Sequence, residues 1–577
     1  MTQATGNLKV ILEGRGPLVI RPAVDHVATG GEGSVYRSGD TVVKIYTDAE
    51  KMRRDDMAGK IKLLSALHHP FVVAPLGAVI GPRGEPIGYY MPFAAGEPLP
   101  RVFTNDFRMR EGFSDQHAAI LAEGMREVVR FAHENKAILV DANELSWIAR
   151  LQGKKNPEPR IIDVDSWAIG RWPATVIMPS IRDWQSKTFD EKSDWFAWGI
   201  VTFQVFAGIH PYKGTLASFD RKDLVGRMKA GASVFAPGIR LNQAVRDFSL
   251  IPAPLLDWYE ATFQQGERTI PPSPLATGAP TATLARVARV VTTASGRLMY
   301  DKLFASPSDP AIRVFPCGAV LTASGRLIDL SSKREIGKPL SREGEAVRKE
   351  GGWLKSDWKN GSAEFSFVAH DFSEEPLTLT ANVYRVIRFE NRLFALTDTG
   401  LSELILKVFA KPVLSIGNTW GVMQNSTRWY DGVGIQDAMG ATYLVAPFGE
   451  DACTHVRVRE LDGMKPVAAK AGQRFIAVSA LDAAGTYQKF EFSMANDYRT
   501  YRPWQGTVDS PDLNVAILPK GVCATIVEDG ELTIFVPTNG NLNKVSDRKV
   551  ATDMLLMHWE NRVVYIFQGE VWQVRLT

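Results

Sequence analysis

The spacing of apolar and polar residues differs between the two halves of the chain. In the first half, residues 42–46 (VVKIY) read as a short strand. Apolar residues then recur at the spacing of one helical face over residues 57–64 and again over 121–128. Ser114 precedes the second of these segments and can cap its helix. We therefore predict that the first half mixes strands and helices in an α+β arrangement.

The second half consists of short alternating runs separated by Gly, Asn or Asp turns, and helical spacing almost disappears. The clearest runs occupy residues 295–302, 324–332, 390–406, 473–492, 521–536 and 560–576. Several read as hairpins around DG, QG or AAG turns, and they recur at intervals of roughly 40 to 50 residues. This texture predicts an all-β domain, best interpreted as a β-propeller of about five to seven four-stranded blades, whose last hairpin closes the ring against the strands after the linker. A pair of β-sandwiches is the alternative, because no WD or kelch signature sets a blade count.

The boundary between the halves is marked by a proline-rich segment. Residues 269–283 (TIPPSPLATGAPTAT) carry four prolines among small residues and interrupt both periodicities. We interpret this segment as a linker between a domain at 1–268 and a domain at 284–577.

Composition and charge exclude several classes of protein. Of 577 residues, 45% are apolar and 23% charged, which excludes a collagen-like, wholly disordered or membrane-embedded chain. The 67 basic and 64 acidic side chains are spread evenly, so no domain has the positive field that a nucleic-acid partner requires. The cysteines are three isolated residues, which excludes a zinc knuckle and a disulfide framework, and no apolar run reaches 18 residues. We expect a cytoplasmic protein without a membrane or nucleic-acid partner.

Residues suited to binding phosphate cluster near the start of the chain. Gly30, Gly31 and Gly33 lie between two strand-like runs, where backbone N–H groups can approach a polyphosphate closely. On its own such a cluster more often marks a simple turn. Lys44 follows as a lone lysine in an apolar strand, and an inward ammonium needs an anionic partner, which phosphate could supply.

Two short turns later in the first half carry carboxylates. Asp141 is followed by Asn143 and Ser146, and Asp163 and Asp165 come after a gap of hairpin size. Oxygen ligands of this kind can hold Mg²⁺ while one carboxylate faces an incoming hydroxyl. The alternative is that Asp141 caps a turn and Asp163 ends a strand, both solvated and inert.

In this order, the motifs resemble those of the eukaryotic-type protein kinase superfamily. The glycine-rich loop has Ala28 in place of its first glycine and ends at Val35, and Lys44 takes the place of the strand lysine. GYYMPFAAGEPL, with Met91, resembles the hinge between lobes. ILVDANELSWIA resembles the catalytic loop, and IIDVDSWAIG resembles the metal-binding D-F-G turn.

Two later motifs extend the resemblance across residues 15–272. SDWFAWGI is similar to the helix whose aspartate, here Asp194, supports the catalytic loop by accepting its backbone N–H bonds. Arg268 takes the place of the arginine that ties down the C-terminal lobe. The motifs IDxDS and GYxMP together resemble those of a divergent bacterial and phage branch of the superfamily, whose members often carry an extra C-terminal module.

The resemblance implies a bilobal fold, with an N-terminal lobe at about 1–92 and a C-terminal lobe at about 93–268, and assigns roles to its residues. Asp141 would be the catalytic base beside Lys44, and Asp163 and Ser146 would bind Mg²⁺. The implied ATP-binding residues are Gly30, Gly31, Gly33, Val35, Lys44 and Met91.

Several departures from the family pattern bear on catalysis. The helix position that normally supplies a glutamate to the strand lysine holds Lys60, so that a lysine faces a lysine, and Asp56 is the nearby acidic substitute. Ser146 replaces the metal-binding asparagine, with Asn143 as a possible stand-in. We expect an ATP- and Mg²⁺-dependent Ser/Thr kinase whose β domain recruits a protein substrate or partner. The alternative is a catalytically impaired pseudokinase scaffold that binds protein partners. AMP transfer on the same fold is a third interpretation, which no residue specifically favours.

Overall fold

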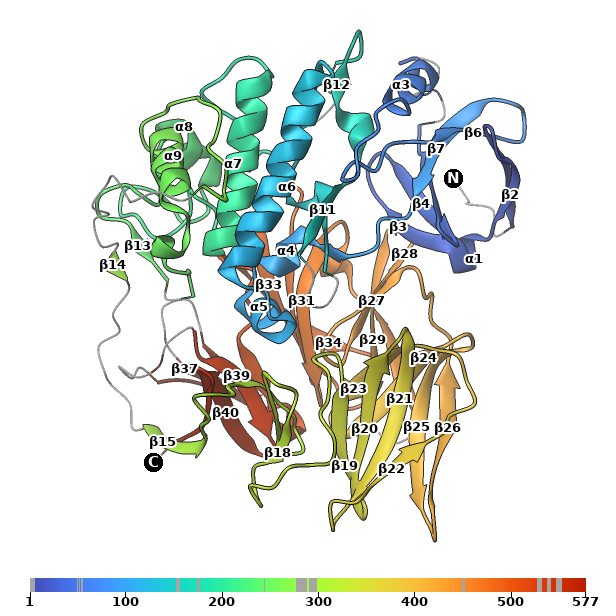
Figure 1. Cartoon of the computed structure of the whole chain (residues 1–577), viewed down its shortest axis with the longest axis vertical. Helices are drawn as coiled ribbons and strands as arrows, with labels where there is room; N and C mark the ends of the chain where they lie inside the picture. The colour runs from blue at the N-terminus through green and yellow to red at the C-terminus, as the bar shows by residue number, and fades with distance from the viewer. Residues whose placement is uncertain are drawn as a thin grey trace.

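Figure 1 shows a computed structural model of the chain, in which a mixed α/β region formed by the first half packs on an all-β region formed by the second. The structure describes residues 6–576 apart from 49, 51, 53–54, 152–155, 174–176, 243, 277–287, 290–297, 449–451, 527–531, 537–540, 546–549 and 551–552. The two textures predicted from apolar spacing are confirmed. Residues 277–283 of the predicted linker lie outside the described residues.

The α/β region begins with a seven-stranded antiparallel sheet of order β2-β1-β6-β7-β5-β4-β3. Its strands are β1 (Leu8–Leu12), β2 (Gly16–Ile20), β3 (His26–Thr29), β4 (Gly33–Ser38), β5 (Thr41–Tyr46), β6 (Gly77–Ile80) and β7 (Pro86–Pro92), with the short helix α1 (Pro22–Asp25) before β3. Helix α3 (Met57–Leu64) buries Met57 and Ile61 against Tyr89 and Met91 of β7, as its apolar spacing predicts.

A helical part follows the sheet. Its elements are β8 (Glu97–Pro98), α4 (Leu99–Val102), α5 (Asn105–Glu111), α6 (Asp115–Glu134), β9 (Ala137–Ile138), η1 (Glu144–Ser146), β10 (Trp147–Arg150), β11 (Glu158–Ile161), η2 (Val164–Ser166), β12 (Ala168–Ile169), α7 (Glu191–Ala207), α8 (Leu224–Ala230), β13 (Arg240–Leu241), η3 (Phe248–Leu250) and α9 (Ala253–Phe263). Ser114 caps α6 as predicted, because its hydroxyl accepts the His117 N–H at 3.2 Å. Helix α7 is buried along almost its whole length, so it forms the centre of this part.

The all-β region contains seven small antiparallel sheets within the described residues, six of four strands and one of three. The first combines β15 (Leu298–Phe304) with β41 (Glu570–Leu576), β40 (Arg562–Phe567) and β39 (Leu555–Trp559). The second and third sheets are β16 (Ala311–Val314), β17 (Ala319–Thr322) and β18 (Leu327–Asp329), followed by β19 (Glu345–Lys349), β20 (Gly352–Lys359), β21 (Ser362–Ala369) and β22 (Glu374–Leu377). The fourth and fifth are β23 (Val383–Phe389), β24 (Arg392–Thr397), β25 (Gly400–Val408) and β26 (Pro412–Trp420), followed by β27 (Thr427–Trp429), β28 (Gly434–Ala438), β29 (Ala441–Phe448) and β30 (Ala452–Arg457). The last two are β31 (Lys465–Gly472), β32 (Phe475–Leu481), β33 (Tyr487–Met494) and β34 (Tyr501–Val508), followed by β35 (Val515–Ile517), β36 (Cys523–Ile526), β37 (Leu532–Val536) and β38 (Asn541–Val545).

The turn chemistry of this region follows the sequence pattern. In the hairpin β40–β41, Gln568 and Gly569 both have positive φ, 51° and 77°. Positive φ at both central residues is the geometry that matches the twist of a two-residue hairpin. The predicted QG turn is therefore present, and β41 pairs antiparallel with β15 as expected for the last hairpin.

The two regions share one hydrophobic core. Val467, Leu481 and Tyr487 of the all-β region pack into the same buried cluster as α4, α6 and α7. At the edge of this contact the Asn105 N–H donates to Asp512 Oδ1 at 2.7 Å, and Arg221 pairs with Asp509 at 3.0 Å. Figure 1 shows β31 and β33 directly beneath the helical part, so the all-β region is firmly attached there.

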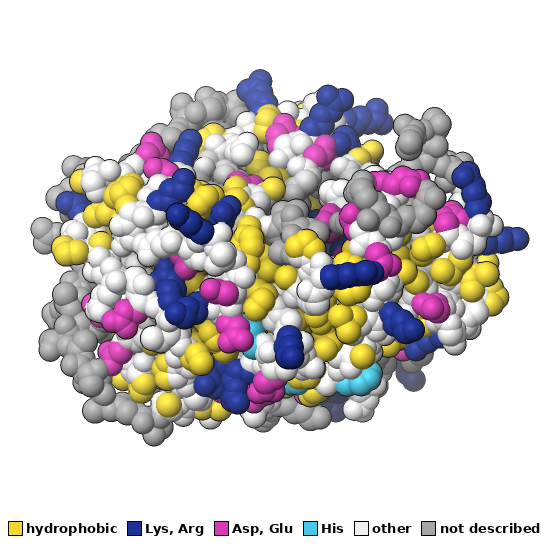
Figure 2. Space-filling model, turned by 90° about the horizontal axis from the view of Figure 1, so that it is seen from above, with side chains coloured by type: hydrophobic (Ala, Val, Ile, Leu, Met, Phe, Trp, Pro, Cys, Tyr) yellow, Lys and Arg dark blue, Asp and Glu magenta, His cyan; other side chains and the backbone are white. Residues whose placement is uncertain are grey.

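Surface charge is mixed, as the composition predicts. Figure 2 shows Lys and Arg side chains interspersed with Asp and Glu on the face seen from above. No helix in the described ranges is long and apolar enough to cross a membrane.

Candidate functional site

Three carboxylates surround the ammonium of Lys44 on β5. The side chain is buried, and its Nζ lies 2.9 and 3.2 Å from the two carboxylate oxygens of Asp165. Glu32 Oε2 lies 3.7 Å away and Asp163 Oδ1 3.8 Å away. Burial by itself would lower the pKa of Lys44, but the nearby carboxylates outweigh it and the pKa is raised. Lys44 is therefore charged, and these carboxylates supply its counter-charge.

Asp165 is the principal partner of Lys44. Its buried carboxylate also accepts hydrogen bonds from the Tyr46 hydroxyl, 2.7 Å from Oδ2, and from the Tyr89 hydroxyl, 2.8 Å from Oδ1. Burial would raise the pKa of Asp165, but the Lys44 charge and these hydrogen bonds lower it. The arrangement holds the Lys44 ammonium in one position.

Lys60 and Asp56 do not make the contacts with Lys44 that the sequence predicts. Lys60 is buried on α3, but its Nζ donates to the backbone carbonyl of Asp165 at 2.7 Å, so the two lysines bind different groups of that residue. Asp56 forms an ion pair with Arg171 and is half exposed. The prediction that Asp56 substitutes for the missing glutamate is wrong, because the turn after Asp163 brings Asp165 under β5 instead.

Asp163 has a left-handed backbone conformation and lies near Lys44. Its φ is 59°, in the left-handed region that L-residues other than Gly, Asn and Asp rarely adopt. The Ser166 hydroxyl donates to the Asp163 carbonyl at 2.8 Å and holds this turn. The Asp163 carboxylate is 48% exposed, so it is open to a ligand.

The loop at 139–146 is folded around Asp141. The Met178 N–H donates to Asp141 Oδ1 at 2.8 Å, and the Ser146 hydroxyl donates to the Asp141 carbonyl at 3.0 Å. Asn143 caps η1 by accepting the Leu145 N–H at 2.8 Å. Burial raises the pKa of Asp141, although the Met178 bond opposes the shift. Ser146 is buried, and its role as a metal ligand stays a prediction.

Asp194 on α7 anchors this loop. Its two carboxylate oxygens accept the backbone N–H groups of Leu139 at 2.8 Å and Val140 at 2.9 Å. His133 Nε2 lies 2.9 Å from the same carboxylate. Val140 has a φ of 59°, so the bonds to Asp194 hold an unfavourable backbone conformation. The predicted support of the loop by a buried aspartate is confirmed.

The glycines at the turn between β3 and β4 differ in their steric surroundings. A Cβ at Gly33 would lie 2.3 Å from the Ile45 carbonyl, so glycine is required there by the close approach of β5. A Cβ at Gly30 or Gly31 would meet nothing within 4 Å. The space beside these two positions is therefore open, but the Gly30 N–H donates to the Gly33 carbonyl at 2.9 Å, and contact of the turn with phosphate stays a prediction.

Val35 and Met91 lie on β4 and β7, the two strands that flank β5. Val35 is opposite Lys44 in the β4–β5 register, and Met91 is opposite Val42 in the β5–β7 register. Both belong to a cluster that includes Tyr89. Their predicted contact with an adenine ring is compatible with this apolar setting and is not tested by it.

Arg268 makes a two-point contact with Asp183. Its Nε lies 2.6 Å from Oδ2, and one terminal nitrogen lies 2.9 Å from Oδ1. Asp183 is buried, so the guanidinium supplies its counter-charge. The end of the helical part is thereby joined to the segment after Met178.

The all-β region contacts the loop through Tyr487. The Tyr487 hydroxyl and Glu144 Oε2 are both buried, and neither has a hydrogen-bond partner in the part of the chain that the structure describes. Burial, followed by the nearby Glu144 charge, raises the pKa of Tyr487. The second region is therefore packed behind the Asp141 loop.

Sequence reasoning missed the roles of Asp165, Tyr46, Tyr89 and Glu32. One signal was present: Lys44 and Tyr46 are two apart on one strand, so both point to the same face. Two polar groups on a buried face predict an anion between them. The identity of that anion depends on the turn after Asp163, which periodicity does not predict.

Comparisons with known proteins give little further guidance. No family model matches the chain, and no curated protein matches it. Among solved structures, the chain is similar to a twitchin kinase fragment from C. elegans, described as an autoregulated protein kinase with immunoglobulin domains, at 15% identity and a TM-score of 0.35. The match covers 43% of this chain and 54% of that one, so the chain spans about half the length of the structure it matches. This similarity carries no argument about function.

Proposed function

We propose that the chain is an ATP- and Mg²⁺-dependent Ser/Thr protein kinase of a divergent kinase-like branch. The observation that carries the proposal is the pairing of Lys44 with Asp165 beside the half-exposed Asp163, in the same region as the Asp141 loop that Asp194 anchors. A charged lysine and an exposed carboxylate are the groups that phosphoryl transfer requires for positioning and charge stabilisation.

The described residues include no group of three or more His, Cys, Asp or Glu side chains that could hold a metal ion by themselves. Mg²⁺ does not need such a cage, since it usually binds one or two carboxylates together with substrate phosphates and water. Asp163 is exposed enough to be one of these carboxylates. The donor set therefore fits Mg²⁺ bound together with ATP, which would supply the phosphoryl group.

Each residue then has a distinct task. Lys44, held by Asp165, would contact phosphate oxygens, and the exposed turn at Gly30 and Gly31, which carries no side chains, would lie over them. The Asp141 carboxylate would accept the proton of the attacking hydroxyl as that oxygen bonds to the γ-phosphorus of ATP, and the bond from this phosphorus to the β–γ bridging oxygen would break, so that ADP leaves. Burial raises the pKa of Asp141, which makes it a better proton acceptor than an exposed aspartate.

We further propose that the first region is bilobal, with lobes at about 1–92 and 93–268, and that the seven sheets form a β-propeller. The pairing of β15 with β41 supports a closed ring, because it joins the two ends of the all-β region in one sheet. In this proposal the propeller recruits a protein substrate or partner in the cytoplasm.

The test is incorporation of label from γ-labelled ATP with Mg²⁺ into the full chain. We expect labelling that Asp141→Asn abolishes and that Asp40→Asn, which changes an exposed carboxylate on the β4–β5 turn, leaves unchanged. Equal labelling of the Asp141→Asn variant and the wild type would refute the assignment of the base.

A pseudokinase scaffold is the second candidate, and one observation favours it: α3 presents Lys60 where kinases have a glutamate. A thermal-shift titration separates the two candidates, because a ligand at 100 times its Kd stabilises a protein by about 2.7 kcal/mol. A melting temperature that ATP and Mg²⁺ leave unchanged, together with absent labelling, would favour the scaffold.

A further inference from the structure

A turn of the all-β region packs closely against the helical part. It is the turn between β32 and β33, flanked by the opposed residues Leu481 and Tyr487. Both are buried in the core that this region shares with α4, α6 and α7, so the place of the turn on the first region is fixed. The Asp482 carboxylate accepts the N–H groups of Ala484 at 2.9 Å and Thr486 at 2.8 Å, which holds the turn itself in one conformation.

Gly485 in this turn lies directly against Ser180. A Cβ added at Gly485 would overlap the Oγ and Cβ of Ser180 and would lie 3.1 Å from Met178 Sδ. Ser180 is fully buried, and its hydroxyl has no hydrogen-bond partner in the part of the chain that the structure describes. Rotation of the Ser180 side chain would move Oγ but not Cβ, so a single methyl group at position 485 must displace the backbone of the segment.

The same segment holds the carboxylate of Asp141. Residues 178–181 form a single turn, since the Ile181 N–H donates to the Met178 carbonyl at 3.2 Å. The Met178 N–H donates to Asp141 Oδ1 at 2.8 Å, so this donor comes from the turn that Gly485 contacts. A displacement within this turn therefore moves the group that orients the carboxylate.

The helical part holds the carbonyl groups of the same segment. His210 Nε2 lies 2.8 Å from the Ser180 carbonyl oxygen, and Trp184 Nε1 donates to the Pro179 carbonyl at 3.1 Å. His210 is buried as well. The segment is thus packed between the β32–β33 turn and the helical part, and it has little room to yield.

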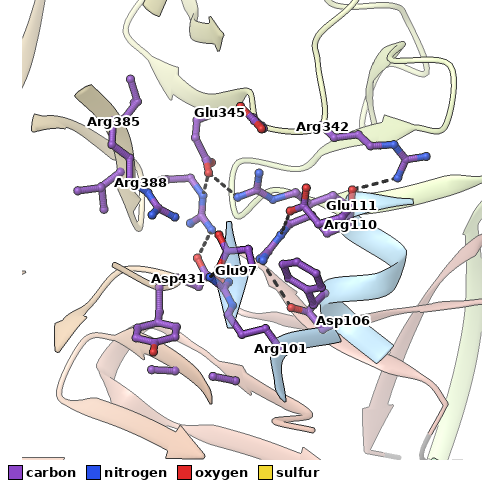
Figure 3. A pocket seen from close by; sticks show the side chains of 18 of the residues that line it. Glu97, Arg101, Asp106, Arg110, Glu111, Arg342, Glu345, Arg385, Arg388 and Asp431 are labelled. Atoms are coloured by element: carbon purple, nitrogen blue, oxygen red, sulfur yellow. Dashed lines mark hydrogen bonds and ion pairs between the residues drawn. The ribbon is translucent and has the colours of Figure 1, made fainter. Parts of the chain in front are cut away.

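The cavity between the two regions is a contact of a different kind. It has a volume of about 500 Å³, and its lining within the described ranges does not include Asp141. Figure 3 shows charged side chains of this cavity paired with one another, as where Arg388 lies 3.1 Å from Glu345 and 2.7 Å from Asp431. These pairs join neighbouring sheets of the all-β region, whereas the β32–β33 turn reaches the Asp141 loop.

We propose that Gly485 is a positioning residue for Asp141, through which the all-β region sets the direction of the Asp141 carboxylate. The inference rests on the proposed kinase function, in which Asp141 is the base. A general base must lie within hydrogen-bond reach of the proton that it accepts, and a misplacement of about 1 Å can lower a rate about 100-fold. Gly485 touches no reacting atom in this scheme and acts only through the turn at 178–181.

The test is Gly485→Ala in the full chain. Its methyl group should displace Ser180, so the maximal rate of labelling from γ-labelled ATP should fall by at least about tenfold. The KM for ATP should stay unchanged, because Lys44 and Asp163 lie on other segments. Hydrogen exchange of the Met178 amide, measured by mass spectrometry, should become at least about tenfold faster, because its bond to the carboxylate is weakened.

Two variants separate this contact from backbone strain. Gly361→Ala also places alanine at a positive φ, 81° against 77° at Gly485, but in the β20–β21 turn a Cβ would meet nothing within 4 Å. It should label and exchange like wild type. Ser180→Gly combined with Gly485→Ala removes the side chain that the new methyl group would overlap, so it should restore both the labelling rate and the slow exchange.

Asp482→Ala is a second variant that adds no atoms. It frees the turn by removing the acceptor of two N–H groups, and it should also speed exchange of the Met178 amide. If wild type incorporates no label, the kinase proposal fails, yet faster exchange in these variants still supports the positioning of Asp141. The positioning is overturned if exchange in folded Gly485→Ala or in Asp482→Ala equals that of wild type, or if the Ser180→Gly combination restores neither readout.

Discussion

Glu144 should make the stability of the protein depend on pH in a way that one substitution removes. It begins η1, three residues after Asp141, and its side chain is buried with Oε2 unpaired among the described residues. Burial raises its pKa from an ordinary 4.5 to about 7, and the Asp141 charge adds to the shift. The carboxyl is therefore protonated in the folded protein at mildly acidic pH, when it is already ionised in the unfolded chain.

The sign and size of the effect follow from this difference. Because the folded-state pKa is the higher one, the folded protein binds more protons between about pH 4.5 and about pH 7. Protonation of Glu144 in the folded protein makes its full contribution to the free energy of unfolding below this window. That contribution is lost as pH rises through the window, by about 1.4 kcal/mol per pH unit. Across the window the loss comes to about 3 kcal/mol.

The assay compares the free energy of urea unfolding of wild type and Glu144→Gln from about pH 4.5 to about pH 8. We expect the two proteins to differ least at the acidic end and the glutamine variant to gain about 3 kcal/mol on wild type by pH 8. Glu134→Gln, at an exposed position on α6, is the control and should show no such trend. A difference between wild type and Glu144→Gln that is constant over this range would refute the reasoning.

Three further predictions concern buried charged contacts in the first region. Asp165→Asn and Lys44→Met should each lower the free energy of unfolding by about 3 kcal/mol, because each leaves a buried charge without its partner. The double variant should lose less than the sum of the two single losses. Additive losses in urea unfolding would contradict the ion pair. Asp194→Ala should lower the free energy of unfolding by about 2 to 4 kcal/mol, since it leaves buried N–H groups of the loop unpaired, and it should reduce the proposed labelling activity. A variant with full stability and full labelling would contradict the anchoring role of Asp194. Arg268→Lys should cost about 1 kcal/mol because it loses the two-point contact with Asp183, and a melting temperature equal to that of wild type would contradict this contribution.

Much of the local structure could be predicted from the order of the residues. The spacing of apolar positions predicted β5, α3 and α6, and the turn residues predicted the β40–β41 hairpin. These elements depend on interactions within a few residues, which periodicity and turn chemistry describe. The support of the Asp141 loop by Asp194 was also predicted, because the motif order placed both residues.

The partner of Lys44 could not be predicted in this way. The sequence pointed to Asp56 on the neighbouring helix, whereas the structure pairs Lys44 with Asp165, more than a hundred residues away. Which carboxylate reaches a buried ammonium depends on how a turn packs beneath a sheet, and that is decided by the desolvation of both charges.

The sequence by itself determined a mixed α/β first half, a second half of short strands, and a balanced surface charge, because each of these follows from local pattern and composition. Only the tertiary structure decided that Glu144 is buried near Tyr487, that Asp165 holds Lys44, and that charged side chains of both regions line one cavity. These features arise where segments distant in the chain share a core or enclose a space. Their energies come from burying charges together, which depends on the packed geometry and not on the order of residues.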